Sequence, residues 1–164
     1  MGDQSGGVVS WSASLASLIA ELTAHPGRLA LLRQTTDTDS TVKLMAAALG
    51  QEPLSVGRAL TLDNDPPAPE RIPVLLGDAT LLVDLNILFW DALVVDPIAV
   101  LTILARKRPR VAVWPGQITG DRAVYSEPGR RDYFAQQLVD AIVLKPRRVV
   151  YPDETPYTME RVQA

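Results

Sequence analysis

An aspartate near the middle of the sequence follows a short apolar run. Leu81, Leu82 and Val83 do not alternate with polar residues, which is typical of a strand covered on both faces within a parallel sheet. Asp84 would then lie at the carboxyl end of that strand, where open α/β sheets bind ligands and where nucleotide-binding proteins hold Mg²⁺ through an aspartate. Aspartate is also a common turn residue after strands. The residues alone leave open whether Asp84 supports a metal or caps a turn.

A second stretch has the layout, but not the residues, of a phosphate-binding loop. The apolar run 29–32 predicts a strand, the residues after it are polar, and a helical pattern begins at an N-cap of Asp39 or Ser40. The signature of such a loop is G-x-x-x-x-G-K-[ST], and the corresponding window, residues 34–41, reads Q-T-T-D-T-D-S-T. Only Thr41 agrees with the signature.

These departures remove the groups that bind a phosphate. Gln34 and Asp39 replace the glycines that let the backbone wrap around the anion, and Ser40 replaces the lysine. Asp39 also places negative charge at the start of the helix, where it offsets the attraction of the helix dipole for an anion, and Lys43 is the cation that could swing back. We therefore expect no cofactor and no NTP hydrolysis. ATP with Mg²⁺, held by this remnant loop and by Asp84, is the alternative.

Basic residues gather at three places. Residues 106–110 form the end of a predicted helix, where cations complement the helix C-terminus, and contact with a phosphate or a partner is the alternative. Residues 130–131 follow a Glu-Pro-Gly turn and have no helix-end role, and the third group is 145–148. The candidate partner-binding residues are the arginines of the first two groups: Arg106, Arg108, Arg110, Arg130 and Arg131.

The composition excludes several classes of site. The chain has no cysteine, so disulfides, thiolate zinc sites and cysteine nucleophiles are excluded. His25 is the single histidine and precedes Pro26 at a predicted helix end, so a multi-histidine metal site cannot form within one chain. The formal net charge of −3 argues against a generally basic surface that coats nucleic acid.

The sequence does not predict a membrane span. Residues 85–105 are apolar over a length that could cross a bilayer, but they contain Asp91, Asp96 and Pro97, and each aspartate would cost roughly 2.5–3.5 kcal/mol at the bilayer centre. No lysine or arginine precedes Arg28, so the N-terminus lacks the basic region of a secretory signal. We expect a cytoplasmic protein.

The remaining patterns predict alternating strands and helices. Helices are expected at 10–25, 40–49 and 97–108, with a proline-rich acidic loop at 63–69 and a helical turn at 133–137. Strands are expected at 29–32, near the start of 54–62, and at 81–83, 110–114 and 139–144, with a hairpin-like excursion at 118–125. With right-handed crossovers, this order predicts a three-layer α/β domain with a mostly parallel five-stranded sheet.

The second half of the sequence resembles a known family. The residues that carry the resemblance are 81–89 (LLVDLNILF), Asp96 with Pro97, 112–116 (AVWPG), 125–129 (YSEPG) and Tyr133. In order and spacing, from about residue 79 to residue 144, they resemble BrxF, the small P-loop protein of type 3 BREX phage-exclusion systems. The resemblance implies a P-loop NTPase-like fold in which Asp84 occupies the Walker B position that supports Mg²⁺. In that family the first strand leads into an intact glycine-rich loop that contains a lysine. The corresponding residues of this chain include neither the glycines nor the lysine, so the first half of the chain matches the family in layout alone.

The chain is divided accordingly into three parts. Residues 1–9 are polar and glycine-rich and are expected to be disordered. Residues 10–145 are expected to form a single P-loop-like α/β domain. Residues 146–164, which carry several prolines, are expected to be a peripheral C-terminal tail that becomes ordered on a partner.

These observations favour one function and leave two alternatives. The favoured function is a non-catalytic assembly or regulatory subunit of a BREX-like anti-phage defence complex, docked on larger ATPase, methyltransferase or phosphatase-like components. The alternatives are an ATP- or GTP-binding NTPase subunit of that system and a DNA-contacting module that uses the basic groups. Salt dependence distinguishes the last, because phosphate contacts weaken linearly in the logarithm of salt concentration.

Overall fold

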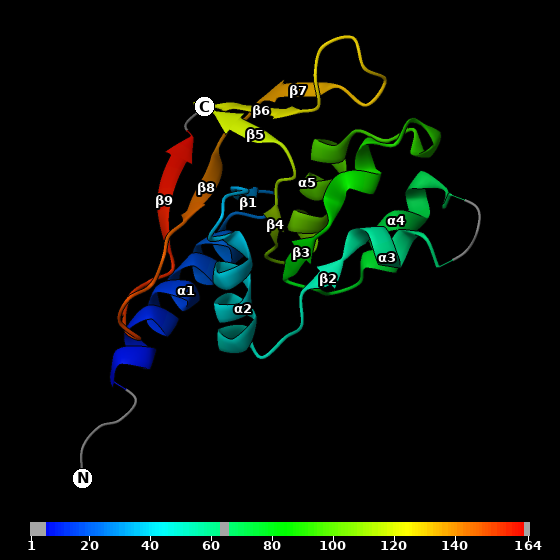
Figure 1. Cartoon of the computed structure of the whole chain (residues 1–164). Helices are drawn as coiled ribbons and strands as arrows, with labels where there is room; N and C mark the ends of the chain where they lie inside the picture. The colour runs from blue at the N-terminus through cyan, green and yellow to red at the C-terminus, as the bar shows by residue number, and fades with distance from the viewer. Residues whose placement is uncertain (1–5, 63–65, 163–164) are drawn as a thin grey trace.

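The computed structural model describes residues 6–62 and 66–162 and is built on two β-sheets (Figure 1). The larger sheet has six strands in the order β2-β3-β4-β1-β8-β9. Its strands are β1 (Ala30–Leu32), β2 (Leu54–Ser55), β3 (Leu81–Val83), β4 (Val111–Val113), β8 (Ala141–Pro146) and β9 (Tyr157–Val162). Strands β2, β3, β4, β1 and β8 are parallel, and β9 pairs antiparallel with β8. The predicted mostly parallel sheet is confirmed, with one strand more than expected.

Helices cover both faces of the larger sheet, so the domain has three layers. α1 (Gly6–Ala24) and α2 (Thr38–Leu49) pack on one face, and α3 (Val56–Leu60), α4 (Ile72–Leu76) and α5 (Pro97–Lys107) pack on the other (Figure 1). Because side chains alternate along a strand, Ala30 and Leu32 contact α1 and α2 whereas Leu31 belongs to the opposite core. Leu82 and Val83 divide between the two faces in the same way. None of the described helices has the length and apolar character that crossing a membrane requires.

The smaller sheet is antiparallel, with β5 (Gln117–Thr119), β6 (Arg122–Tyr125) and β7 (Phe134–Gln137) in that order. The hairpin expected at 118–125 is confirmed. The helical turn expected at 133–137 is wrong, because these residues pair with β6 as strand β7. Phe134 lies edge-on to Phe89, with the ring centroids 5.7 Å apart, and a contact with so distant a residue is not visible in a local sequence pattern.

The strand expected near residue 54 is only two residues long. Ser55 Oγ accepts a hydrogen bond from the Arg58 N–H at 3.2 Å and so caps α3, which turns the chain into a helix. Three short 3-10 helices complete this side of the molecule: η1 (Pro69–Arg71), η2 (Leu85–Phe89) and η3 (Asp91–Leu93). Of the acidic loop expected at 63–69, residues 63–65 lie outside the described residues.

Caps set the ends of the two helices that follow β1 and η3. Asp96 accepts hydrogen bonds from two backbone N–H groups in the first turn of α5, at 2.9 and 3.2 Å, as the Asp-Pro start predicts. α2 ends at Gly50, whose φ of 66° is the left-handed conformation that glycine adopts without a steric penalty. Its N-cap is Asp37, earlier than the Asp39 or Ser40 expected from the sequence.

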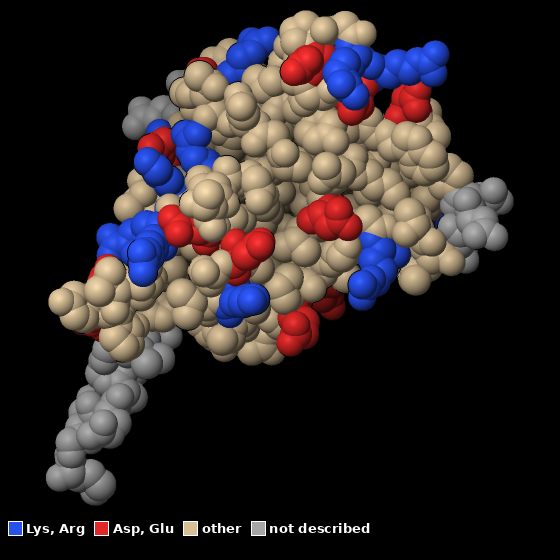
Figure 2. Space-filling view, viewed as in Figure 1, with Lys and Arg blue, Asp and Glu red and all other residues tan. Residues whose placement is uncertain are grey.

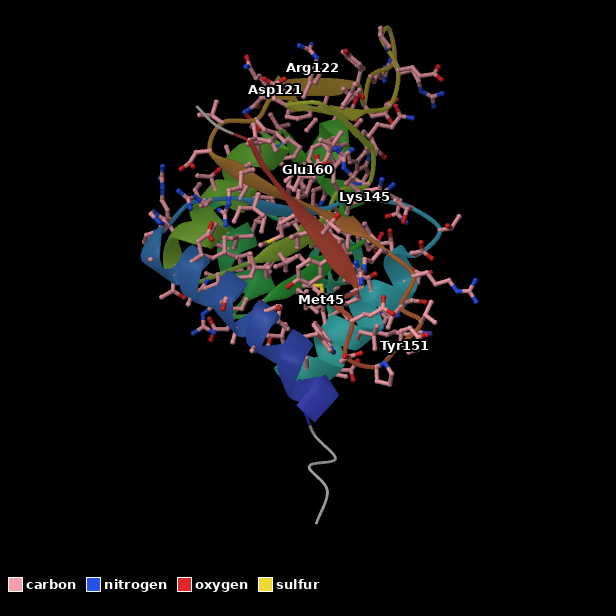
Figure 3. The ribbon with its side chains drawn as sticks, turned by 90° about the vertical axis from the view of Figure 1, so that its left-hand side faces the viewer. Met45, Asp121, Arg122, Lys145, Tyr151 and Glu160 are labelled. Atoms are coloured by element: carbon pink, nitrogen blue, oxygen red, sulfur yellow. The ribbon has the colours of Figure 1, made fainter. Side chains whose placement is uncertain are left out.

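Both ends of the chain are more ordered than expected. α1 begins at Gly6, so only residues 1–5 of the segment expected to be disordered lie outside the described residues. The C-terminal tail is not peripheral, because β9 forms the edge strand beside β8 (Figure 3). Arg161 on β9 pairs with Glu21 on α1, and this hydrogen bond, more than the nearby charge of Arg28, lowers the pKa of the Glu21 carboxyl.

Candidate functional site

The loop between β1 and α2 leaves the interior of the larger sheet at its carboxyl edge. β1 pairs with β4 on one side and with β8 on the other. From β1 the chain crosses to β2 at one edge of the sheet, whereas from β4 it passes β1 to reach β8, so the connections that leave these two neighbouring strands run in opposite directions. Such a position, where strand order reverses, is where α/β proteins bind ligands. The window expected to bind phosphate is therefore in the right place.

The side chains of this loop are bonded to its own backbone. The Thr38 hydroxyl accepts a hydrogen bond from the Thr35 N–H at 2.7 Å and donates one to the Arg33 carbonyl at 2.8 Å. The Asp37 N–H donates to the Thr35 hydroxyl at 3.1 Å. Two backbone donors that an anion would need are thus already satisfied inside the loop.

Thr41, the residue that agrees with the phosphate-loop signature, is covered by the C-terminal part of the chain. Its side chain is fully buried, and its hydroxyl donates to the Pro156 carbonyl at 3.0 Å. The same carbonyl accepts a hydrogen bond from the Arg147 N–H at 2.9 Å, and the Arg147 guanidinium pairs with Glu154 at 2.8 Å. Residues 147–156, which we call the strap, therefore hold the hydroxyl that would contact Mg²⁺ in an intact phosphate loop.

The other residues of the remnant loop do not converge on one site. Lys43 borders a separate hollow of about 390 Å³ along the C-terminal half of α2. The loop's own cation, Arg33, donates to the Ile118 carbonyl and pairs with Glu160 on β9 at 3.3 Å (Figure 3). The remaining three residues of the set are exposed: Gln34, Asp39 and Ser40.

Asp84 lies at the carboxyl end of β3, as expected, and is tied to the neighbouring strand. Its Oδ2 accepts a hydrogen bond from the Ser55 hydroxyl at 2.8 Å, and its carbonyl accepts one from the Gly57 N–H at 3.0 Å. A Cβ at Gly57 would lie 2.3 Å from Asp84 Oδ2, so a side chain at this position would displace the Asp84 carboxylate. Asp84 thus joins β3 to the start of α3. The described residues contain no group of three or more His, Cys, Asp or Glu side chains placed to hold a metal ion.

Arg110, predicted to bind a partner, is instead a buried structural residue. Burial lowers the pKa of its guanidinium, which nevertheless remains a donor at physiological pH. The guanidinium donates to three backbone carbonyls, at 3.3, 2.8 and 2.8 Å: those of Leu104, Ala79 and Gly77. No surface is left for a partner to contact.

The two other arginines of this group lie at the surface near the end of α5. Arg108 pairs with Asp78 at 3.6 Å, and both side chains are largely exposed. Arg106 is exposed and its aliphatic stem lies over Gly27, where a Cβ would approach Arg106 Cγ to 3.2 Å. Arg108 thus contacts the segment before β3, whereas Arg106 contacts the residues that follow α1. Neither arginine lines any of the hollows described, so neither shares a cavity with the remnant loop.

Arg130 and Arg131 border a hollow of about 730 Å³, which we call the aromatic hollow. One wall comes from η2 and the residues after it, and the other comes from the end of β6 and the loop to β7 (Figure 1). A volume of this size is typical of a ligand site. Its lining residues are Asn86, Ile87, Phe89, Trp90, Asp91, Tyr125, Arg130, Arg131 and Asp132.

Stacked rings hold the aromatic hollow in shape. Tyr125 stacks on Phe89 with ring centroids 3.8 Å apart, and Trp114 lies edge-on to Phe89 at 5.4 Å. The Asn86 side-chain amide donates to the Tyr125 hydroxyl at 3.2 Å and so joins η2 to β6. The rings are therefore fixed in the free protein and provide a preformed apolar floor.

The charges at the aromatic hollow are of both signs. Asp132 accepts a hydrogen bond from Ser126 Oγ at 2.6 Å and pairs with Arg130 Nε at 3.7 Å. Arg131 and Asp91 are exposed, and neither forms an ion pair within the described residues. Figure 2 shows cationic and anionic side chains intermixed along the upper part of the molecule, where the β6–β7 loop lies in Figure 1.

Sequence reasoning identified the two arginines of the aromatic hollow but missed its aromatic wall. Tyr125 was assigned only to a family motif, and Trp90 was assigned no role. No local pattern marks Trp90 as exposed, because it directly follows the apolar residues 87–89. No family model, curated protein or solved structure matches this chain.

Proposed function

We propose that this chain is a non-catalytic, P-loop-like subunit of a BREX-like anti-phage defence complex, where it docks on a larger ATPase, methyltransferase or phosphatase-like component. The resemblance of residues 79–144 to BrxF supports the assignment to phage exclusion. The loop after β1 and the aspartate after β3 share the carboxyl edge of the sheet, as a phosphate loop and a Mg²⁺ aspartate do. This layout supports descent from a nucleotide-binding domain.

The observation that carries the non-catalytic assignment is that the β1–α2 loop is closed on itself. Phosphoryl transfer depends on preorganised donors and cations around the transferred group. Here the Thr38 hydroxyl already accepts a hydrogen bond from the Thr35 N–H, and the Thr41 hydroxyl already donates one to the Pro156 carbonyl. Lys43 borders a different hollow. A nucleotide would have to break these contacts and bind beside the exposed Asp39.

The aromatic hollow supports a role in assembly. Arg130 is two-thirds exposed and its pair with Asp132 is long, so the guanidinium can turn toward a partner at little cost. Exposed tryptophan, tyrosine and arginine side chains are the residues that most often dominate protein–protein binding energy. Trp90, Tyr133 and Arg131 meet at this surface.

A nucleotide titration tests the non-catalytic assignment. With ATP or GTP at millimolar concentration and Mg²⁺ present, we expect no binding heat by calorimetry. A dissociation constant of about 10 µM or tighter, about −6.8 kcal/mol, would contradict the proposal and favour the NTPase alternative. Asp84→Asn, which keeps an oxygen acceptor for the Ser55 hydroxyl, is the matched variant, because it should abolish Mg²⁺-dependent binding if such binding exists.

Co-purification tests the assembly role. The chain is expressed from its native gene neighbourhood with an affinity tag, and the retained proteins are identified by mass spectrometry. We expect a large defence component to be retained by the wild type and lost with Arg130→Glu combined with Arg131→Glu. Retention that disappears on nuclease treatment, and binding whose affinity falls linearly with log salt, would favour the DNA-contacting alternative instead.

A further inference from the structure

Three exposed apolar side chains border a second, smaller hollow of about 170 Å³ that adjoins the aromatic hollow. Trp90 is 49% exposed, Val94 is 80% exposed and Tyr133 is 38% exposed. Trp90, Arg131 and Asp132 line both hollows, so the two hollows share a wall. Single exposed apolar residues are ordinary, but a group of them around a concave, preformed floor is typical of a contact site.

The backbone at Val94 is strained, although the side chain is exposed to solvent. Its φ of 50° and ψ of 54° are left-handed, a conformation that is costly for a β-branched residue. In the free chain no burial compensates for this, since the Val94 side chain is largely exposed. Strain that persists at an exposed position is often part of a binding surface.

The charges restrict what can bind there. Asp132 accepts a hydrogen bond from Ser126 and forms a long, exposed ion pair with Arg130, so Arg131 is the cation of the aromatic hollow without an ion pair and Asp91 is the anion without one. A polyanion such as single-stranded nucleic acid would meet Asp91 and Asp132 wherever it approached Arg131. A polypeptide can place one carboxylate at Arg131 and keep uncharged atoms near Asp91.

We infer that the aromatic hollow receives a short polypeptide segment of a protein partner, in which a bulky apolar side chain is followed directly by an acidic one. The apolar side chain enters the aromatic hollow and lies against the exposed face of Trp90. The carboxylate pairs with Arg131 at the rim. This inference rests on the proposed assembly function and specifies the chemistry of the segment that docks.

Synthetic peptides test this inference without the native partner. Acetyl-Gly-Leu-Phe-Glu-Gly-amide is compared with the same peptide carrying Lys in place of Glu, and with one carrying Ser-Ser in place of Leu-Phe. Trp11 and Trp114 are buried, so Trp90 is the tryptophan that acrylamide quenches and that a docked peptide protects. We expect the Leu-Phe-Glu peptide to protect Trp90 with a dissociation constant of about 1 mM or tighter, and at least about tenfold tighter than either comparison peptide.

Variants assign the two contacts. Arg131→Ala should remove the preference for Glu over Lys, whereas Arg71→Ala, an exposed arginine on η1 that does not line the aromatic hollow, should leave it unchanged. A variant is compared with the wild type only if the two proteins have the same melting temperature. Equal affinity for the Glu and Lys peptides, no protection at about 1 mM peptide, or protection by a thymidine oligonucleotide or ATP in place of the peptide would each overturn the inference.

The outcome is independent of the nucleotide and co-purification experiments. If the peptides fail while the chain still retains a defence component through Arg130 and Arg131, the assembly function stands and the peptide chemistry is wrong. If the peptides bind as expected but no defence component is retained, the docking site stands and the proposed complex is wrong.

Discussion

The Arg110 guanidinium joins α5 to the segment between α4 and β3, because it donates to the carbonyls of Leu104, Gly77 and Ala79. A buried acceptor left without a donor costs about 1–3 kcal/mol. We expect Arg110→Met to lower the free energy of unfolding by about 2–4 kcal/mol in urea denaturation. Arg108→Met is the control, since its ion pair is exposed and contributes at most about 1 kcal/mol. Equal losses for the two variants would contradict the structural role of Arg110.

Tyr157 makes stability depend on pH in the alkaline range. Burial raises the pKa of its phenol to about 12, against about 10 in the unfolded chain. Between pH 10 and 12 the unfolded state loses this proton while the folded state keeps it, so the free energy of unfolding falls as pH rises, by up to about 2.7 kcal/mol. Tyr157→Phe should remove that part of the decline.

Urea denaturation at pH 8, 10 and 11 measures the effect. The Tyr157 hydroxyl has no hydrogen-bond partner among the described residues, so Tyr157→Phe should be neutral or stabilising at pH 8. Tyr151→Phe, at a position that is 66% exposed, is the matched control and should follow the wild-type profile. A parallel decline for Tyr157→Phe and wild type would show that the phenol is not responsible.

Residue types alone could not separate the arginines by role. Arg108 and Arg110 stand two positions apart in one basic run, and both were assigned to a partner. Arg110 lies beside β4, where the neighbouring ends of α4 and α5 present carbonyls, and that environment exists only in the folded chain. Arg130 and Arg131 could be placed correctly at a surface because a Glu-Pro-Gly turn precedes them.

At the scale of elements, local chemistry made some parts predictable. The Asp96-Pro97 start of α5 and the stop of α2 at Gly50 follow from capping and from glycine's conformational freedom. β7 could not be predicted, because its four residues become a strand only by pairing with β6 and packing on distant rings. β9 was missed because the prolines of the strap mask the short alternating strand that follows them.

The C-terminal strand is part of the folding unit, which a truncation tests. A chain that ends after Pro146 loses buried Tyr157, the Pro156 acceptor of Thr41 and the Arg161 pair with Glu21. We expect it to unfold at a urea concentration well below that of the full chain, with a loss of at least about 3 kcal/mol, or not to fold. A chain that lacks only residues 163–164 is the control, and a stable first truncation would mean that the tail is peripheral.

At the scale of the whole molecule, the two regions lie at the same carboxyl edge but have different properties. The β1–α2 loop is closed by its own hydroxyls and by the strap, and the aromatic hollow is open, rigid and partly apolar. We expect this combination in a domain that descends from a nucleotide-binding protein and now acts, as proposed, in the assembly of a complex. The replaced glycines and lysine of the loop can be seen in the sequence, but the hollow needs η2 and the β6–β7 loop to be brought together by folding.

Phage protection separates assembly from catalysis in the intact system. If the chain is the proposed non-catalytic subunit, Asp84→Asn should leave plaque formation within about threefold of the wild type, because no phosphate chemistry would then depend on the carboxylate and the Ser55 hydroxyl keeps an acceptor. Arg130→Glu with Arg131→Glu should abolish protection, since like charges at a close contact with an acidic partner cost several kcal/mol. Arg71→Glu is the control, because it makes the same kind of charge reversal at one position on a surface away from the aromatic hollow. Loss of protection with Asp84→Asn, while a pull-down still recovers the complex, would contradict the assembly role and favour a working nucleotide site.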